Sequence, residues 1–159
     1  MSDAIAVEVA KAVTAQIAAA TLSQTFTAER SYAEWDVELK DEDELHVDVV
    51  VVTTEQTADL SSQSTVKYLI PVDIGVRKKF GPEKQNDDTG RIQIESVDEL
   101  VLLVQEIHEL FTPQRLAGFD PGVWQETKIV VSPATKHLRE MRQFTGIVRV
   151  TFRVDRKVV

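Results

Sequence analysis

The feature that most constrains the fold is an unbroken two-residue alternation in residues 65–80, TVKYLIPVDIGVRKKF. Every second residue is apolar or aromatic over six positions, which is the period of a β-strand with one face on a hydrophobic core. These positions are Val66, Tyr68, Ile70, Val72, Ile74 and Val76. Pro71 stands on the other face and has no N–H to donate, so we expect the strand to lie at an edge there or to be bulged.

The alternation ends in three consecutive cations, Arg77, Lys78 and Lys79, although the 159-residue chain has a net charge of −8. The charge is unevenly distributed, since residues 1–127 hold 10 Lys/Arg and 24 Asp/Glu, whereas residues 128–159 hold 8 and 2. Such a chain either carries opposite charges on two surfaces, which suits head-to-tail association, or neutralises its acidic half within one folded unit.

The other segments predict a mixture of helices and strands. Residues 3–22 have the apolar spacing of a helix that Ser2 can cap, and a second helix of about 16 residues is predicted from the Ser96–Glu99 capping box to Pro113. Further strands are predicted at 26–32, 45–53, 124–131 and 144–154, and polar loops at 53–65 and 81–95. This order predicts a single α+β domain over 1–159, an antiparallel or mixed β-sheet with two helices packed on one face, which is a two-layer sandwich.

No group of residues points to catalysis. The chain has no cysteine, which excludes a thiol nucleophile and a disulfide. His46, His108 and His137 lack metal-ligand spacing, and no phosphate-binding or nucleophile-elbow motif is present. We therefore expect no enzyme, cofactor or metal; a small ligand-binding domain or enzyme with a deep pocket lined by His46 or His108 is the alternative.

An acidic run contains eight carboxylates between Glu34 and Asp48. A calcium-binding loop would need a central glycine that this run lacks, so an exposed turn or short helix with solvated charges is expected. Nucleic-acid binding by the cations is disfavoured, because the chain is acidic overall and aromatic residues do not interleave with the cations.

Four segments carry a family resemblance: a short amphipathic N-terminal helix, the hairpin strand YLIPVDIGVRKKF, the central helix VDELVLLVQEIHELF and the closing strand FTGIVRVTFRV preceded by LREMRQ. In this order the chain resembles the tail terminator and tail-completion (neck) proteins of long-tailed bacteriophages. The resemblance implies a structural virion protein without a catalytic site, which forms a homohexameric ring. It implies that the ring caps the tail tube, stops its polymerisation and joins it to the head connector.

The implied partners are other copies of the chain, the tail tube protein and the head connector or neck protein. DNA would pass through the lumen of the ring without specific binding. The implied location is the tail or neck of the virion, with assembly in the host cytoplasm. An alternative is another head–tail joining or assembly adaptor protein of similar fold, which binds a different protein through an edge strand.

Charged side chains are the candidate interface residues. They are Arg77, Lys78, Lys79, Arg149, Arg153, Arg156, Lys157, Asp41, Glu42, Asp43 and Glu44. In a ring, these cations would pair with acids of a neighbouring subunit or of the tube, and the acids would line the lumen or one ring face. Alternatively, Arg77 to Lys79 form a solvated strand end that discourages edge-to-edge aggregation.

Overall fold

The computed structural model describes residues 4–32, 34–52, 57–62, 64–111, 116–119 and 121–157, with only the backbone described for 57–62. The elements follow in the order α1 (Ile5–Ala19), β1 (Thr27–Arg30), β2 (Leu45–Val51), β3 (Thr57–Ser62), β4 (Thr65–Lys79), the 3₁₀ turn η1 (Pro82–Lys84), α2 (Ile94–Leu110), β5 (Gly122–Val131), α3 (Thr135–Met141) and β6 (Gln143–Lys157). Within these ranges, no helix has the length and apolarity that a membrane span requires.

The strands form one mixed sheet. Its order is β1-β2-β4-β6-β5, with β3 paired to the first residues of β4. β1 runs parallel to β2, and the other pairings are antiparallel. β4 and β6 pair along their whole lengths, from Thr65 opposite Lys157 to Lys79 opposite Gln143. The predicted α+β class and the mixed sheet are confirmed.

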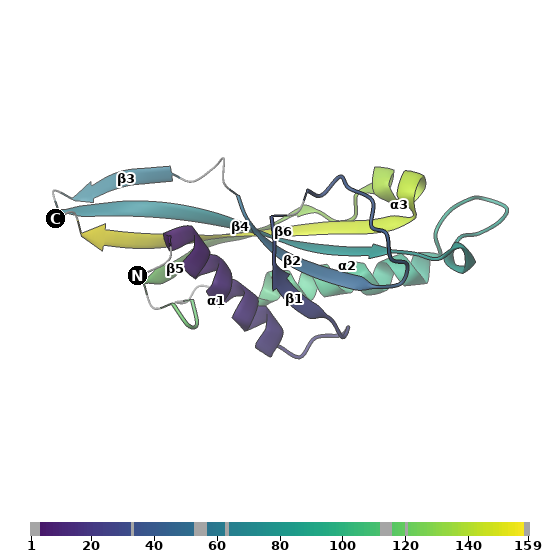
Figure 1. Ribbon diagram of the computed structural model, residues 1–159, viewed down its shortest axis with the longest axis horizontal. Coiled ribbons are helices and arrows are strands. Elements are labelled where there is room, and N and C mark those ends of the chain that lie inside the picture. Colours follow the sequence, from purple (N-terminus) through teal and green to yellow (C-terminus); the bar gives the residue numbers. More distant parts are fainter. Residues whose placement is uncertain are drawn as a thin grey trace.

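The two long helices cover one face of the sheet, as predicted. α1 and α2 lie on one side of the long strands and α3 lies on the other (Figure 1). We call the face under α1 and α2 the inner face and the opposite one the outer face. The alternating residues of β4 and β6 point to the inner face and join the apolar stripes of both helices in one continuous core. Burying each Val, Ile, Leu or Phe side chain there stabilises the fold by about 1.5–3 kcal/mol relative to exposing it.

Pro71 lies inside β4 at the one place where a missing N–H costs little. The ladder with β2 ends there, because Val52 N–H donates to the Pro71 carbonyl at 3.1 Å and Pro71 has no N–H to return the bond. The ladder with β3 begins two residues earlier in β4, at Leu69 opposite Thr57. Pro71 therefore sits in a gap between two neighbouring strands, which confirms the predicted local edge.

Beyond this gap the sheet narrows to an arm. β3 and the paired ends of β4 and β6 extend past the helices (Figure 1), and the β4 residues Thr65–Leu69 are only half-buried. The predicted loop 53–65 is therefore wrong over Thr57–Ser62, where β3 forms; residues 53–56 and 63 of this prediction lie outside the described residues. A polar segment forms a strand there because the edge of β4 next to Val66 and Leu69 offers unpaired backbone groups.

Two further predictions need correction. α2 begins at Ile94 after the N-cap residue Gln93, so the predicted Ser96 capping box is wrong, and the end of the predicted loop 81–95 belongs to this helix. The short helix α3 was not predicted, because seven residues are too few for a clear apolar period. The predicted cap Ser2 and the predicted stop Pro113 lie outside the described residues.

Candidate functional site: a fastened acidic segment

Residues 34–44 connect β1 to β2 and cross the outer face of the sheet; we call them the crossing segment. They contain seven of the eight carboxylates of the acidic run. The segment is made of turns and bends without helix, and all of its residues are exposed except Trp35 and Leu39, which are half-buried. The prediction of an exposed turn is confirmed. Three buried side chains, Arg77, Gln143 and His137, bind this segment to the sheet and to α3.

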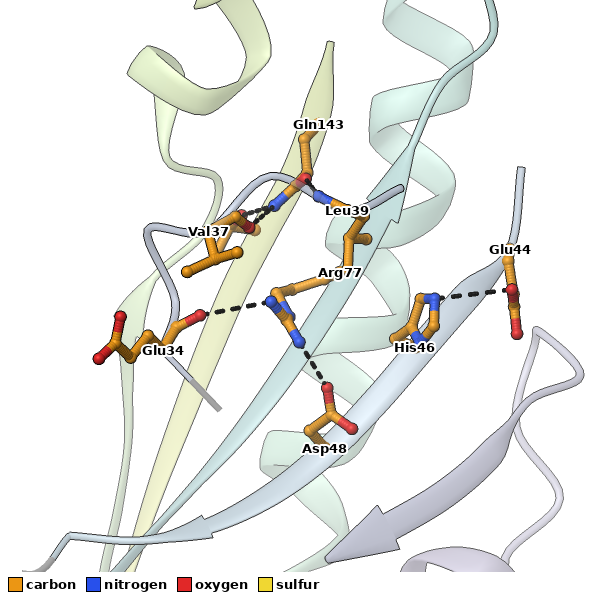
Figure 2. Close-up of polar contacts among 9 residues, drawn as sticks. Glu34, Val37, Leu39, Glu44, His46, Asp48, Arg77 and Gln143 are labelled. Carbon is orange, nitrogen blue, oxygen red and sulfur yellow. Dashed lines mark hydrogen bonds and ion pairs between the residues drawn. The ribbon is translucent and has the colours of Figure 1, made fainter. Parts of the chain in front are cut away.

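Arg77 is the first of three buried side chains that bind the crossing segment; we call these three side chains the fasteners. Its Nη2 donates to Asp48 Oδ2 at 2.8 Å, and its Nη1 donates to the backbone carbonyl of Glu34 at 3.4 Å (Figure 2). The guanidinium carbon also lies 5.3 Å from the centroid of the Trp35 ring, within the range of a cation–π contact. Arg77 and Asp48 are only 6% and 7% exposed, so each charge depends on the other to offset its lost hydration.

A glycine makes room for Trp35. Gly75 lies on the outer face of β4, two residues before Arg77, and a Cβ atom on it would collide with the Trp35 ring. The absence of a side chain lets the indole lie directly on the strand backbone. Trp35 therefore anchors the start of the crossing segment by shape as well as by the contact with Arg77.

Gln143 is the second fastener and is fully buried at the start of β6. Its Oε1 accepts the backbone N–H of Leu39 at 2.8 Å, and its Nε2 donates to the backbone carbonyl of Val37 at 3.5 Å (Figure 2). One amide side chain thus replaces a neighbouring strand for two residues of the crossing segment. This satisfies backbone groups that would otherwise lose their hydrogen bonds near the sheet.

His137 of α3 is the third fastener. Its Nδ1 lies 2.7 Å from Thr145 Oγ1 of β6, and its Nε2 lies 3.1 Å from Asp36 Oδ1 of the crossing segment. The imidazole is 7% exposed, whereas the Asp36 side chain is almost fully exposed. α3 therefore lies against the outer face and holds one carboxylate of the crossing segment in place.

A second, largely buried ion pair lies on the same outer face. Asp73 of β4 is directly opposite Arg149 of β6, and Arg149 donates to it twice, from Nε at 2.7 Å and from Nη2 at 3.2 Å. Asp73 is 6% exposed. This two-pronged geometry fixes both side chains and pairs β4 to β6 at the centre of the sheet.

The structure corrects the prediction that Arg77 faces outward at a solvated strand end or toward a neighbour. Arg77 is buried within its own chain, and Arg149 is held by Asp73. Lys79 pairs with Glu38 at 2.6 Å, and Lys78 lies 6.0 Å from the centroid of the Phe80 ring. The three-cation run therefore binds residues of its own chain.

The predicted acidic interface residues lie beside this run. Glu42 pairs with Arg142 at 3.0 Å, and Glu44 lies 3.8 Å from His46 (Figure 2). Asp43 has a left-handed backbone with φ of 61°, and its N–H donates to the Lys79 carbonyl at 2.7 Å. Asp41 is exposed. Glu42 and Glu44 thus contact Arg142 and His46 of their own chain, which are not among the predicted interface cations, and Asp43 bonds to the backbone of Lys79.

The C-terminal cations are far from this site. Arg156 pairs with Val66 at the opposite end of β4, roughly 35 Å from Arg77 at the usual rise per strand residue. Arg156 and Lys157 are exposed on the arm, and Arg153 lies 3.5 Å from Asp155. The structure therefore divides the predicted interface residues into two separate regions.

Sequence reasoning missed Trp35, Gln143 and the contacts of His137. One signal was present: Asp48 and Asp73 interrupt apolar strands, and buried acids require partners. The partner of each acid could not be read from the sequence, because it depends on strand register.

In the described part of the chain, no group of three or more His, Asp or Glu side chains is placed to hold a metal ion. His46, His108 and His137 lie on β2, α2 and α3 respectively. No protein-family model matches the chain, and no curated protein is significantly similar to it.

Proposed function

We propose that this chain is a structural subunit of a long-tailed phage, a tail terminator of which six copies form a ring. The ring caps the tail tube, stops its growth and joins it to the head connector, while DNA passes through its lumen without specific binding. The α+β fold with two helices on one face is compatible with this proposal.

One observation carries the proposal: buried polar side chains hold an exposed acidic segment. Arg77, His137 and Gln143 are each at most 7% exposed, and each bonds to the crossing segment. Burying polar groups is favourable only when their bonds are made, and here those bonds fix the position of an exterior loop. A protein that works through its surface, by contacts with identical copies and with a tube, needs such a preorganised loop.

A second candidate is an assembly adaptor that binds another protein through an edge strand. β5 favours it, because this ten-residue strand pairs only with β6 among the described strands. Ile129 and Val130 of β5 are each 43% exposed. A long strand edge with exposed apolar residues is a surface to which an extended peptide can add.

Electron microscopy of tail tubes tests the first proposal. Purified protein is added to tubes that are polymerising from the tube protein of the same virus. We expect a ring at one end of each tube and tubes that stop growing, with a bound mass six times that of the 17.8 kDa chain. Tubes that grow unchanged without bound protein would contradict the proposal, and capture of an unrelated protein through the β5 edge would favour the adaptor.

A further inference from the structure

An apolar groove lies between the start of α2 and α3. Its volume is about 650 Å³, and its apolar lining comes from Ile92, Ile94, Val97 and Leu138. Ile94 is 71% exposed even though it begins a helix that is otherwise anchored in the core. An apolar side chain that is this exposed beside a groove marks a surface suited to a partner.

Two arginines line the same groove. Arg91 precedes α2 and Arg139 belongs to α3, and both are exposed. The groove also contains one acid, Asp98, and Arg139 lies 3.8 Å from Glu140, also on the surface. The groove therefore suits an apolar side chain that is flanked by carboxylates, because the arginines can pair with them while the apolar group is buried.

The crossing segment contains such an exposed apolar side chain flanked by two carboxylates. Val37 is 52% exposed and stands between Asp36 and Glu38. These two carboxylates contact His137 and Lys79 of their own chain, but their side chains are 98% and 51% exposed and can accept further bonds. Gln143 holds its carbonyl and the following N–H of Leu39, so the backbone is already fixed in the free subunit. A preorganised loop loses little conformational entropy on binding, which leaves more of the contact energy for affinity.

The loop and the groove meet at α3 without overlapping. His137 contacts Asp36 on the side of the crossing segment, whereas Leu138 and Arg139 line the groove. Val37 is not among the residues that line the groove. A contact between these two surfaces therefore joins two copies of the chain.

We propose that Val37 of one copy, with Asp36 and Glu38, docks in the groove between α2 and α3 of the next copy. This proposal rests on the ring function and names its subunit contact. A ring requires that this contact repeat head-to-tail from copy to copy, whereas two copies that exchanged loop and groove reciprocally would stop at a dimer. Arg91 and Arg139 supply the charge that orients the incoming loop.

Cysteine cross-linking tests this contact, because the chain has no cysteine of its own. The double variant Val37→Cys/Ile94→Cys is treated with a short bis-maleimide, and the products are separated under denaturing conditions. We expect a ladder from dimer to hexamer. The matched control is Val37→Cys/Leu102→Cys, since Leu102 is also an exposed apolar residue of α2, at 50%, but does not line the groove.

A mixture of the two single variants Val37→Cys and Ile94→Cys should give a dimer joining one of each, because each chain then carries half of the contact. Adding Arg139→Glu to the double variant should lower the ladder yield several-fold, whereas Lys136→Glu on the same helix should leave it unchanged. A ladder no stronger than that of the Leu102 control, or cross-linking of the Ile94→Cys groove to the tube protein alone, would overturn the docking proposal.

The failure of the docking proposal can be separated from that of the ring function. Tubes capped by the double variant without a ladder would contradict the docking contact and leave the terminator role standing. A ladder without capping would support the contact and contradict the terminator role.

Discussion

On the inner face of the sheet, Gly146 of β6 leaves room for Val104 of α2; on the outer face, Gly75 of β4 leaves room for the ring of Trp35. A Cβ on Gly146 would lie 2.6 Å from a Val104 methyl group, and a Cβ on Gly75 would collide with the indole. A glycine in the strand thus allows close packing of a helix on one face and of an irregular segment on the other. The inner face is held by apolar packing, whereas the outer face is held by a few directional bonds from buried polar groups.

This difference shows what each face can do. Apolar packing tolerates exchange of similar side chains and depends on total volume. The outer face depends on individual donors and acceptors, so removing one partner leaves another buried and unsatisfied. The inner face makes the fold stable, and the outer face determines where the crossing segment lies.

The largest effect is expected from Asp48→Ala. Arg77 would keep its charge in a buried site without its partner, so we expect the free energy of unfolding in urea to fall by about 3–5 kcal/mol. The double variant Asp48→Leu/Arg77→Met removes both charges and should be clearly more stable than the single variant. A single variant within about 1 kcal/mol of wild type would show that the outer face does not depend on this pair.

A somewhat smaller loss is expected from Leu103→Ala on the inner face. Leu103 is fully buried in α2, and the cavity should cost about 2–5 kcal/mol in the free energy of unfolding. Leu102→Ala is the matched control at the preceding, exposed position of the helix and should change the free energy of unfolding by at most about 0.5 kcal/mol. Equal losses at the two positions would be incompatible with the assigned inner face.

Gly75→Ala should destabilise by about 1–3 kcal/mol, because its Cβ must displace the Trp35 ring. The added variant Trp35→Ala removes the collision, so the two changes should not be additive in a double-mutant cycle. Chemical denaturation gives the free energies, and limited proteolysis should show faster cleavage of the crossing segment in Gly75→Ala. Strict additivity would argue against direct contact between Gly75 and Trp35.

The smallest effect is expected from Lys79→Ala. The Lys79 side chain is only 14% exposed, but its partner Glu38 is half exposed and stays hydrated when the pair is broken, so we expect a loss of about 1 kcal/mol. The difference from wild type should shrink further at high salt, measured by urea unfolding at two ionic strengths. A loss as large as that of Asp48→Ala would mean that half-exposed and fully buried ion pairs on the outer face contribute equally to stability.

The inner face could be predicted because its signal is local. The alternation of β4 and the stripes of α1 and α2 identify inward residues from neighbours two to four positions away. Pro71 likewise predicted a local edge in β4, and the end of β2 supplies it. β3 was missed because its partner is an edge that exists only after β2 has ended.

The outer face could not be predicted because its contacts join distant residues. Arg77 and Asp48 are 29 positions apart, His137 and Asp36 are 101 apart, and Leu39 and Gln143 are 104 apart. The charged run at Arg77 therefore looked like a surface feature. The register of β4 with β2 brings Arg77 diagonally next to Asp48, and the contacts of Arg77 with Glu34 and Trp35 place it under the crossing segment.

Amide hydrogen exchange at Leu39 tests most directly whether the outer face fastens the crossing segment. The Leu39 N–H donates to the buried Gln143 side chain, whereas its neighbour Asp41 is exposed. We predict that the Leu39 amide exchanges much more slowly than the amide of Asp41 in wild type and that this protection disappears in Gln143→Ala. Leu39 and Asp41 amides that exchange equally fast in the wild-type protein would contradict the account.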